Sequence, residues 1–148
     1  MTHEPSAISS SDHLPWAPVR PGFDLKVLHG RADEETRALL LRLAPGTVID
    51  RHRHEGEVHA LNLSGQRKLL ETGEIVGPGG YVYEPPGNVD SWMAVGDEPL
   101  IVFVTVRGAI ESLDDDGNVT RRSTTAEIAA TYQRHVETIR GAAARSRS

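Results

Sequence analysis

The stretch RHRHEGEVHALNLSG, residues 51–65, contains three of the seven histidines of the chain: His52, His54 and His59. Side chains two residues apart on a β-strand point to the same face, so His52 and His54 are expected to project together. Imidazole is a common ligand of iron, zinc, nickel and copper. The spacing therefore predicts a two-histidine metal platform, whereas a lone His-x-His between arginines is typical of a solvated surface.

The segments around this stretch have the alternation and turn residues of an all-β chain. Strands bounded by glycine, proline or serine turn signals are expected within residues 23–30, 36–46, 57–65, 66–73, 77–87 and 99–110. DDDGNV, residues 114–119, predicts a hairpin turn with Asp116 and Gly117 at its tip. The prolines around residues 16–22 favour a loop there. Many short strands at this spacing predict a sandwich or a barrel.

Helical periodicity occurs only near the C-terminus. Thr124 and Glu127 fit a capping box at the start of a helix. The apolar residues that would then share one helical face are Ile128, Tyr132, Val136 and Ile139. The expected organisation is a polar, disordered segment over 1–15, a barrel over 16–123, and a helix with a basic tail over 124–148.

Composition limits the classes of function. A chain of 148 residues is typical of one domain. It has no cysteine, which excludes disulfides, thiolate metal sites and cysteine nucleophiles. A formal net charge of −5 argues against nucleic acid as a partner. Because no apolar run suits a bilayer crossing and the start does not resemble a signal peptide, we expect a cytoplasmic protein without a membrane partner.

Two motifs resemble those of the cupin superfamily. GTVIDRHRHEGEVHALNLSG, residues 46–65, resembles the first, which reads Gly, five residues, His-x-His, three or four residues, Glu, six residues, Gly. GGYVYEPPGNVD, residues 79–90, resembles the second, which reads Gly, five residues, Pro-x-Gly, two residues, His. The matching positions are Gly46, His52, His54, Gly65, Gly79, Pro85 and Gly87. The resemblance implies a double-stranded β-helix, the jelly-roll barrel, with a C-terminal α-helix appended.

Two positions depart from these motifs. Val58 stands at the glutamate position when it is counted back from Gly65, and His59 stands there when the longer spacing from His54 is used. Asp90 replaces the final histidine of the second motif. The metal-ligand set that the resemblance implies is therefore altered in this chain.

Three interpretations of the altered set remain open. His52, His54 and Asp90 can form a two-histidine, one-carboxylate face of the kind that suits Fe(II) and leaves positions open. A bulge at Gly56 would also turn His59 inward and give three histidines with one carboxylate. Alternatively, Asp90 marks the loss of tight metal binding.

Three further segments narrow the resemblance. WAPVRPGFDLKVL, GQRKLLE and GGYVYEPPG are similar to the branch that includes 2,4'-dihydroxyacetophenone dioxygenase and acetylacetone-cleaving dioxygenase. This implies an Fe(II) enzyme that uses O2 to cleave a C–C bond next to a carbonyl in a small diketone or hydroxyketone, with Zn, Ni or Mn as other metals. Glu71 resembles an acidic residue near the metal in that branch, so it is the candidate catalytic base.

Candidate substrate-binding residues are Asn62, Tyr83 and Trp92, although each can equally serve core packing. Two other functions remain open: a non-catalytic cupin that binds or senses a ligand, and a Zn, Mn or Ni isomerase or hydrolase. The alternating apolar residues of the outer strands would face water in a monomer, so we expect a homodimer.

Overall fold

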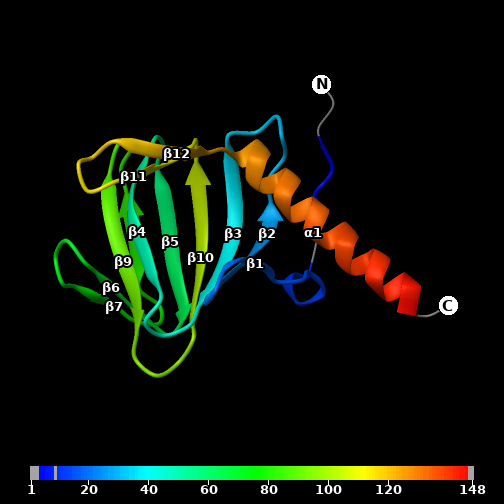
Figure 1. Ribbon diagram of the computed structural model, residues 1–148, viewed down its shortest axis with the longest axis horizontal. Coiled ribbons are helices and arrows are strands. Elements are labelled where there is room, and N and C mark those ends of the chain that lie inside the picture. Colours follow the sequence, from blue (N-terminus) through cyan, green and yellow to red (C-terminus); the bar gives the residue numbers. More distant parts are fainter. Residues whose placement is uncertain (1–3, 9, 147–148) are drawn as a thin grey trace.

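The computed structural model describes residues 4–8 and 10–146 and contains two six-stranded antiparallel sheets (Figure 1). The first sheet has the order β1 (Ala17–Arg20), β2 (Phe23–His29), β3 (Thr36–Leu43), β10 (Leu100–Arg107), β5 (Val58–Ser64) and β8 (Tyr81–Glu84). The second has the order β12 (Val119–Ser123), β11 (Ile110–Leu113), β4 (Val48–His54), β9 (Val89–Val95), β6 (Gln66–Leu69) and β7 (Ile75–Val76). Strands distant in sequence pair as neighbours, and this topology confirms the predicted jelly-roll barrel.

The main core lies between the two sheets. Strand β10 alternates buried and partly exposed residues along its length, as expected for a strand with one face on the core. The buried cluster comprises Leu39, Leu43, Val58, Ala60, Trp92, Ala94, Leu100, Val102, Val104 and Val106. Both sheets contribute to this cluster, so the apolar interior holds them together and fixes which residues face inward.

The N-terminal part of the barrel differs from the prediction. The expected loop over residues 16–22 is wrong for Ala17–Arg20, which form β1. β1 pairs only with β2 and therefore lies at the edge of its sheet. An edge strand tolerates Pro18 because the missing N–H can fall on the unpaired side. The expected disorder of residues 1–15 stays a prediction: residues 1–3 and 9 lie outside the described part of the chain, and Ser11–His13 form a short 3-10 helix, η1.

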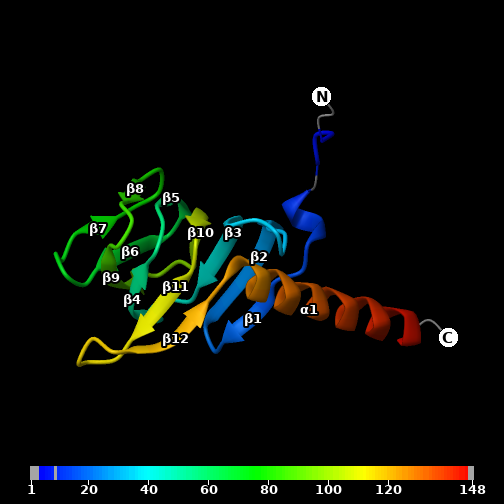
Figure 2. The same cartoon turned by 90° about the horizontal axis from the view of Figure 1, so that it is seen from above.

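The predicted C-terminal helix is α1 (Thr125–Ser146), and the N–H of Glu127 donates to Oγ1 of Thr124 at 3.2 Å, as expected for a capping residue. Tyr132 and Val136 are buried against β1 and β2. Figures 1 and 2 show that the far end of α1 extends beyond the sheets. Within residues 4–8 and 10–146, no helix has the length and apolar character that a membrane crossing requires.

Candidate metal centre

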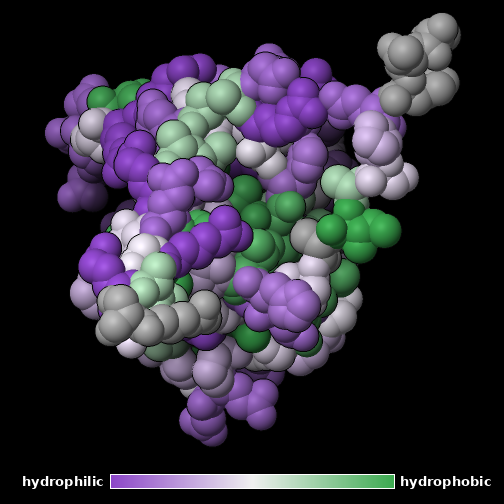
Figure 3. All heavy atoms as spheres, turned by 90° about the vertical axis from the view of Figure 1, so that its right-hand side faces the viewer, coloured by the Kyte–Doolittle hydropathy of each residue, from purple (hydrophilic) through white to green (hydrophobic). Residues whose placement is uncertain are grey.

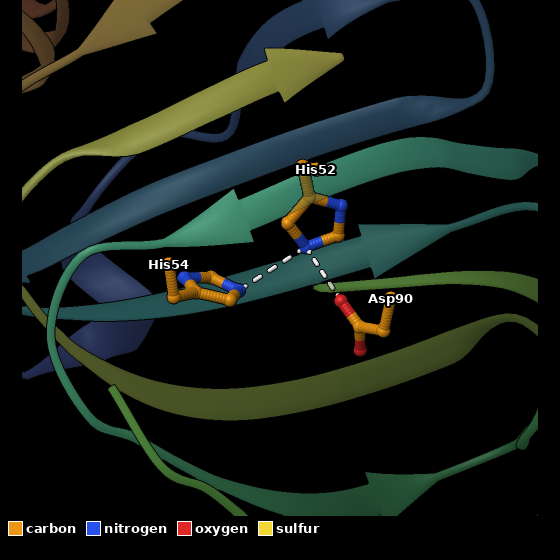
Figure 4. A group of neighbouring side chains, drawn as sticks. All are labelled: His52, His54 and Asp90. Atoms are coloured by element: carbon orange, nitrogen blue, oxygen red, sulfur yellow. Dashed lines mark hydrogen bonds and ion pairs between the residues drawn. The ribbon is translucent and has the colours of Figure 1, made fainter. Parts of the chain in front are cut away.

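Strands β4 and β9 bring together the three donors that the motifs suggested. His52 and His54 occupy alternate positions of β4, and both side chains are buried in the barrel. β9 runs antiparallel to β4 and places Asp90 directly opposite His52. Figure 4 shows the two imidazoles and the carboxylate converging on one point.

The spacing of the donor atoms fits a single ion. Nε2 of His52 lies 3.1 Å from Nε2 of His54 and 2.9 Å from Oδ1 of Asp90, and donor atoms of all three residues lie within 4.8 Å of one another. Two nitrogens that each lie about 2.0–2.1 Å from one ion at a right angle are about 3 Å apart. Nδ1 of His52 donates to the carbonyl oxygen of Asp50 at 2.7 Å, so its Nε2 is free to bind a metal. The residues therefore fit a divalent cation.

The protonation states of the site follow from burial and from the His52–Asp90 pair. Burial, together with a smaller effect of the neighbouring His52, lowers the pKa of His54 to about 4. Burial also acts to lower the pKa of His52, but the Asp90 carboxylate outweighs this effect and leaves it raised. Burial acts to raise the pKa of Asp90, whereas His52 brings it below the ordinary value. In the metal-free protein, the Asp90 carboxylate thus favours the protonated form of His52.

A second buried carboxyl group, Glu84, adjoins the three donors. Its Oε2 lies 3.9 Å from Nε2 of His54, and its Oε1 accepts a hydrogen bond from Asn88 at 2.8 Å. Burial, together with a smaller effect of the nearby Asp90 carboxylate, raises the pKa of Glu84 to about 7. The sequence motifs did not point to Glu84. The signal that could have found it is its place opposite Val58 across β5 and β8, which puts both on the inner face.

Two arginines in the barrel were also missed. Arg37 of β3 is fully buried, and its Nη1 donates to the carbonyl oxygen of Gly108 and to Oγ1 of Thr125, both at 2.9 Å. Arg67 of β6 is 2% exposed, and its guanidinium carbon lies 4.9 Å from the ring centroid of Trp92. Arg37 shares the strand parity of Leu39 and Leu43, so alternation along β3 could have placed it on the inner face.

The structure also places the remaining candidate residues. Asn62 and Trp92 face the interior and are buried. Asn62 donates to the carbonyl oxygen of Val76 at 3.0 Å. Glu71 lies at the surface and accepts a hydrogen bond from Ser91 at 2.8 Å, on the opposite face of β9 from Asp90.

His59 and Tyr83 lie on the outer face of the first sheet. Tyr83 is 50% exposed, and its ring centroid is 5.3 Å from that of His59. His59 Nδ1 is hydrogen-bonded to the hydroxyl of Tyr81. The structure therefore does not bring His59 or Tyr83 to the three donors.

A separate hollow lies at the other end of the molecule. It has a volume of about 680 Å³ and lies between the N-terminal segment, β2 and α1, with Val27, Leu28 and Val136 among its lining residues. Figure 3 shows apolar side chains gathered on this face. His52, His54 and Asp90 do not line it, so the hollow is distinct from the candidate metal centre.

A jelly-roll barrel with histidine and carboxylate donors in its interior is the architecture of a cupin. The chain belongs to the family described as the ChrR cupin-like domain, whose model matches residues 4–110. This confirms the resemblance to the cupin superfamily. No curated protein gives a significant match to the chain.

Solved structures agree with this assignment. An RmlC-like cupin protein from Ralstonia eutropha has a TM-score of 0.84 at 21% identity and covers 90% of this chain and 88% of its own. An acetylacetone dioxygenase from Acinetobacter johnsonii has a TM-score of 0.75 at 17% identity, covering 90% and 93%. The SigE–ChrR anti-sigma complex from Rhodobacter sphaeroides has a TM-score of 0.57 at 18% identity, covering 66% and 51%. At these identities the likeness establishes the fold.

Proposed function

We propose that this cupin is a metal-dependent dioxygenase that uses Fe(II) to cleave a C–C bond next to a carbonyl in a small diketone or hydroxyketone. The observation that carries the proposal is the convergence of His52, His54 and Asp90 within 4.8 Å inside the barrel. Two histidines and one carboxylate are the ligand set of non-haem Fe(II) oxygenases. The fold shared with an acetylacetone dioxygenase supports the same reaction class.

The side chains of the chain suit this chemistry. A bound Fe(II) would supply Lewis-acid polarisation of the substrate carbonyl and an open position for O2. Glu84, instead of the exposed Glu71, is the carboxyl group we propose as proton acceptor, because its pKa of about 7 is matched to neutral pH. The indole of Trp92 and the buried Asn62 would border the substrate, and Val58 beside Glu84 would exclude water.

The direct test is O2 consumption by anaerobically purified protein reconstituted with Fe(II) and offered a panel of diketones and hydroxyketones. We expect O2 uptake by the wild type and a loss of at least about 100-fold in Asp90→Ala, because a metal ligand is removed. Glu71→Gln is the matched control and should retain activity, because Glu71 lies outside the barrel interior. Iron retention without O2 uptake on any compound of the panel would exclude the dioxygenase.

A second candidate is a cupin that binds a ligand or metal as a sensor. The observation in its favour is membership of the ChrR cupin-like domain family, together with the fold shared with ChrR in its complex with SigE. A sensor would hold the metal without consuming O2, and would change its affinity for a protein partner when the metal is removed. A third candidate, a Zn, Mn or Ni isomerase or hydrolase, would hold its metal and convert its substrate without O2.

We further propose that the chain forms a homodimer through the outer face of β10, β5 and β8. By strand alternation the outward residues of these strands are Ile101, Phe103, Thr105, Arg107, His59, Leu61, Leu63, Tyr81 and Tyr83. Arg107, at the end of β10, is the charged member of this set, and four of the others are among the exposed large apolar residues of the described chain. A largely apolar face of this kind suits the self-complementary contact of a two-fold dimer.

A further inference from the structure

Arg67 is a buried cation with two donor nitrogens that lack partners. Its side chain is 2% exposed, and within the described chain neither Nε nor Nη2 has a hydrogen-bond partner. Arg37, the other buried arginine, also has unpaired Nε and Nη2 atoms within the described chain, but its Nη1 donates to Gly108 and Thr125 and so joins β3 to the start of α1. Buried donors are almost always satisfied in folded proteins. The Arg67 fork is therefore ready to accept a ligand that carries acceptor oxygens.

The strand register directs Arg67 toward the candidate metal centre. Arg67 pairs with Ala94 of β9, and Asp90, Trp92 and Ala94 share the buried face of that strand. The guanidinium lies over Trp92, which is nearer than Ala94 to Asp90 along the strand. Successive residues of a strand rise about 3.4 Å, so Trp92 lies about 7 Å along β9 from Asp90. The Arg67 guanidinium and Asp90 are therefore directed to the same inner face, about two strand positions apart.

The charged side chains of the interior also favour a ligand that carries negatively charged oxygens. When ionised, Asp90 and Glu84 balance the two buried guanidinium groups, Arg37 and Arg67. A divalent ion would leave the interior with a net charge of about +2. A neutral diketone leaves this net charge unchanged, because the proton it loses as an enolate passes to Glu84. A diketone that also carries a carboxylate offsets half of it.

We propose that Arg67 binds a carboxylate of the substrate, so that the preferred substrate is a small β-dicarbonyl acid whose carbonyl oxygens face His52, His54 and Asp90. The inference rests on the proposed function and narrows its substrate class. Arg67 suits this role because its planar fork matches a carboxylate with two parallel hydrogen bonds. The face of Trp92 holds the guanidinium plane in place from one side.

The test compares two probes of equal length. 2,4-Dioxopentanoate and pentane-2,4-dione differ by one group, a carboxylate in place of a terminal methyl. Their dissociation constants would be measured by calorimetry on Zn(II)-loaded protein, which cannot turn either compound over by redox chemistry. We expect the wild type to bind the acid at least about tenfold more tightly, because a charge-assisted bidentate pair forms only with the acid. In Arg67→Met this preference should fall below about threefold.

Arg67→Lys keeps the charge and loses the fork, and should retain an intermediate preference for the acid. Zinc content and circular dichroism of each variant verify that fold and metal centre are intact. An unchanged preference in Arg67→Met would overturn the proposal, because the carboxylate would then bind elsewhere, on the ion for example. O2-dependent cleavage of pentane-2,4-dione without any preference for the acid would refute the Arg67 subsite alone. A clear preference for the acid without O2 uptake by the Fe(II) protein would refute the dioxygenase alone.

Discussion

The inner and outer faces of the barrel wall use the same residue type in different ways. His52 and His54 of β4 point into the interior, where Asp90 and Glu84 supply negative charge. His59, in the following strand, points outward between Tyr81 and Tyr83. The comparison shows that a cluster of histidines in sequence defines no ligand set by itself. Strand alternation and a converging carboxylate decide which histidines can hold an ion.

The largest expected effect is on metal affinity, which should separate the inward histidines from the outward His59. His52→Ala should weaken Zn(II) binding by at least about 100-fold, because it removes one of three ligands from a buried site. His59→Ala is the matched control on the outer face and should change the affinity by less than about threefold. Competition with a chromogenic chelator measures both dissociation constants.

The opposite result would break the comparison. If His59→Ala lost zinc as His52→Ala is expected to, a rearrangement at Gly56 would have to turn His59 inward in the metal-bound protein. Gly56 has no room for a side chain, since a Cβ added there would lie 2.2 Å from the carbonyl oxygen of Arg107. Gly56→Ala would then distinguish the two cases, because its Cβ disfavours the backbone described here and should promote any such rearrangement.

The sequence predicted which side chains of β4 face inward, because there the cupin motif and the strand alternation agreed. The spacing of His52 and His54 requires a shared face in any strand, and strand alternation already favoured an outward His59. The parity of β8 was wrong in the prediction, because Tyr83 was expected inside the barrel as a substrate-binding or core residue. In the structure Tyr81 is 59% exposed and Glu84 is 6% exposed. A single strand cannot reveal which face is inward; pairing with β5 decides it.

Arg67 could not be predicted for a related reason. A strand of four residues with two basic side chains has the composition of a solvated edge. Its burial depends on β9, which places Ala94 and Trp92 beside it. Asp90 and Glu84 come close enough to stabilise a cation only when the barrel has folded. The periodicity of a single strand therefore cannot predict this interaction between distant charges.

The second prediction concerns acid stability and contrasts a buried histidine with the solvated unfolded chain. The pKa of His54 is about 4 in the fold, against 6.5 as its ordinary value. Between these two values the unfolded chain binds a proton that the folded protein does not bind, so the free energy of unfolding falls as the pH decreases. For the metal-free protein we expect His54 to contribute a loss of about 2–3 kcal/mol between pH 7 and pH 4.

Urea denaturation in the presence of a chelator measures this loss, with metal-free His54→Asn as the control. His52 acts with the opposite sign, because its raised pKa adds stability below its ordinary value that is lost as the pH rises through the folded value. The difference between wild type and His54→Asn cancels the His52 contribution to first order. Equal losses in the two proteins would show that His54 is exposed to water in the metal-free state.

The smallest expected effect concerns the outer face. Leu61 lies opposite Phe103 on one side and Tyr81 on the other, at the centre of the proposed dimer contact. Leu61→Lys places a charge there and should weaken dimerisation by about tenfold, with little effect on folding because the side chain is 37% exposed.

Val119→Lys is the matched control, since Val119 is 46% exposed on β12 of the other sheet. Sedimentation equilibrium over a concentration series gives both dissociation constants. A wild-type protein that stays monomeric at high concentration would refute the dimer, and an equal effect of Val119→Lys would move the interface to the second sheet. Retained zinc affinity in Leu61→Lys is also expected, because the outer face would then affect assembly while the inner face alone holds the ion.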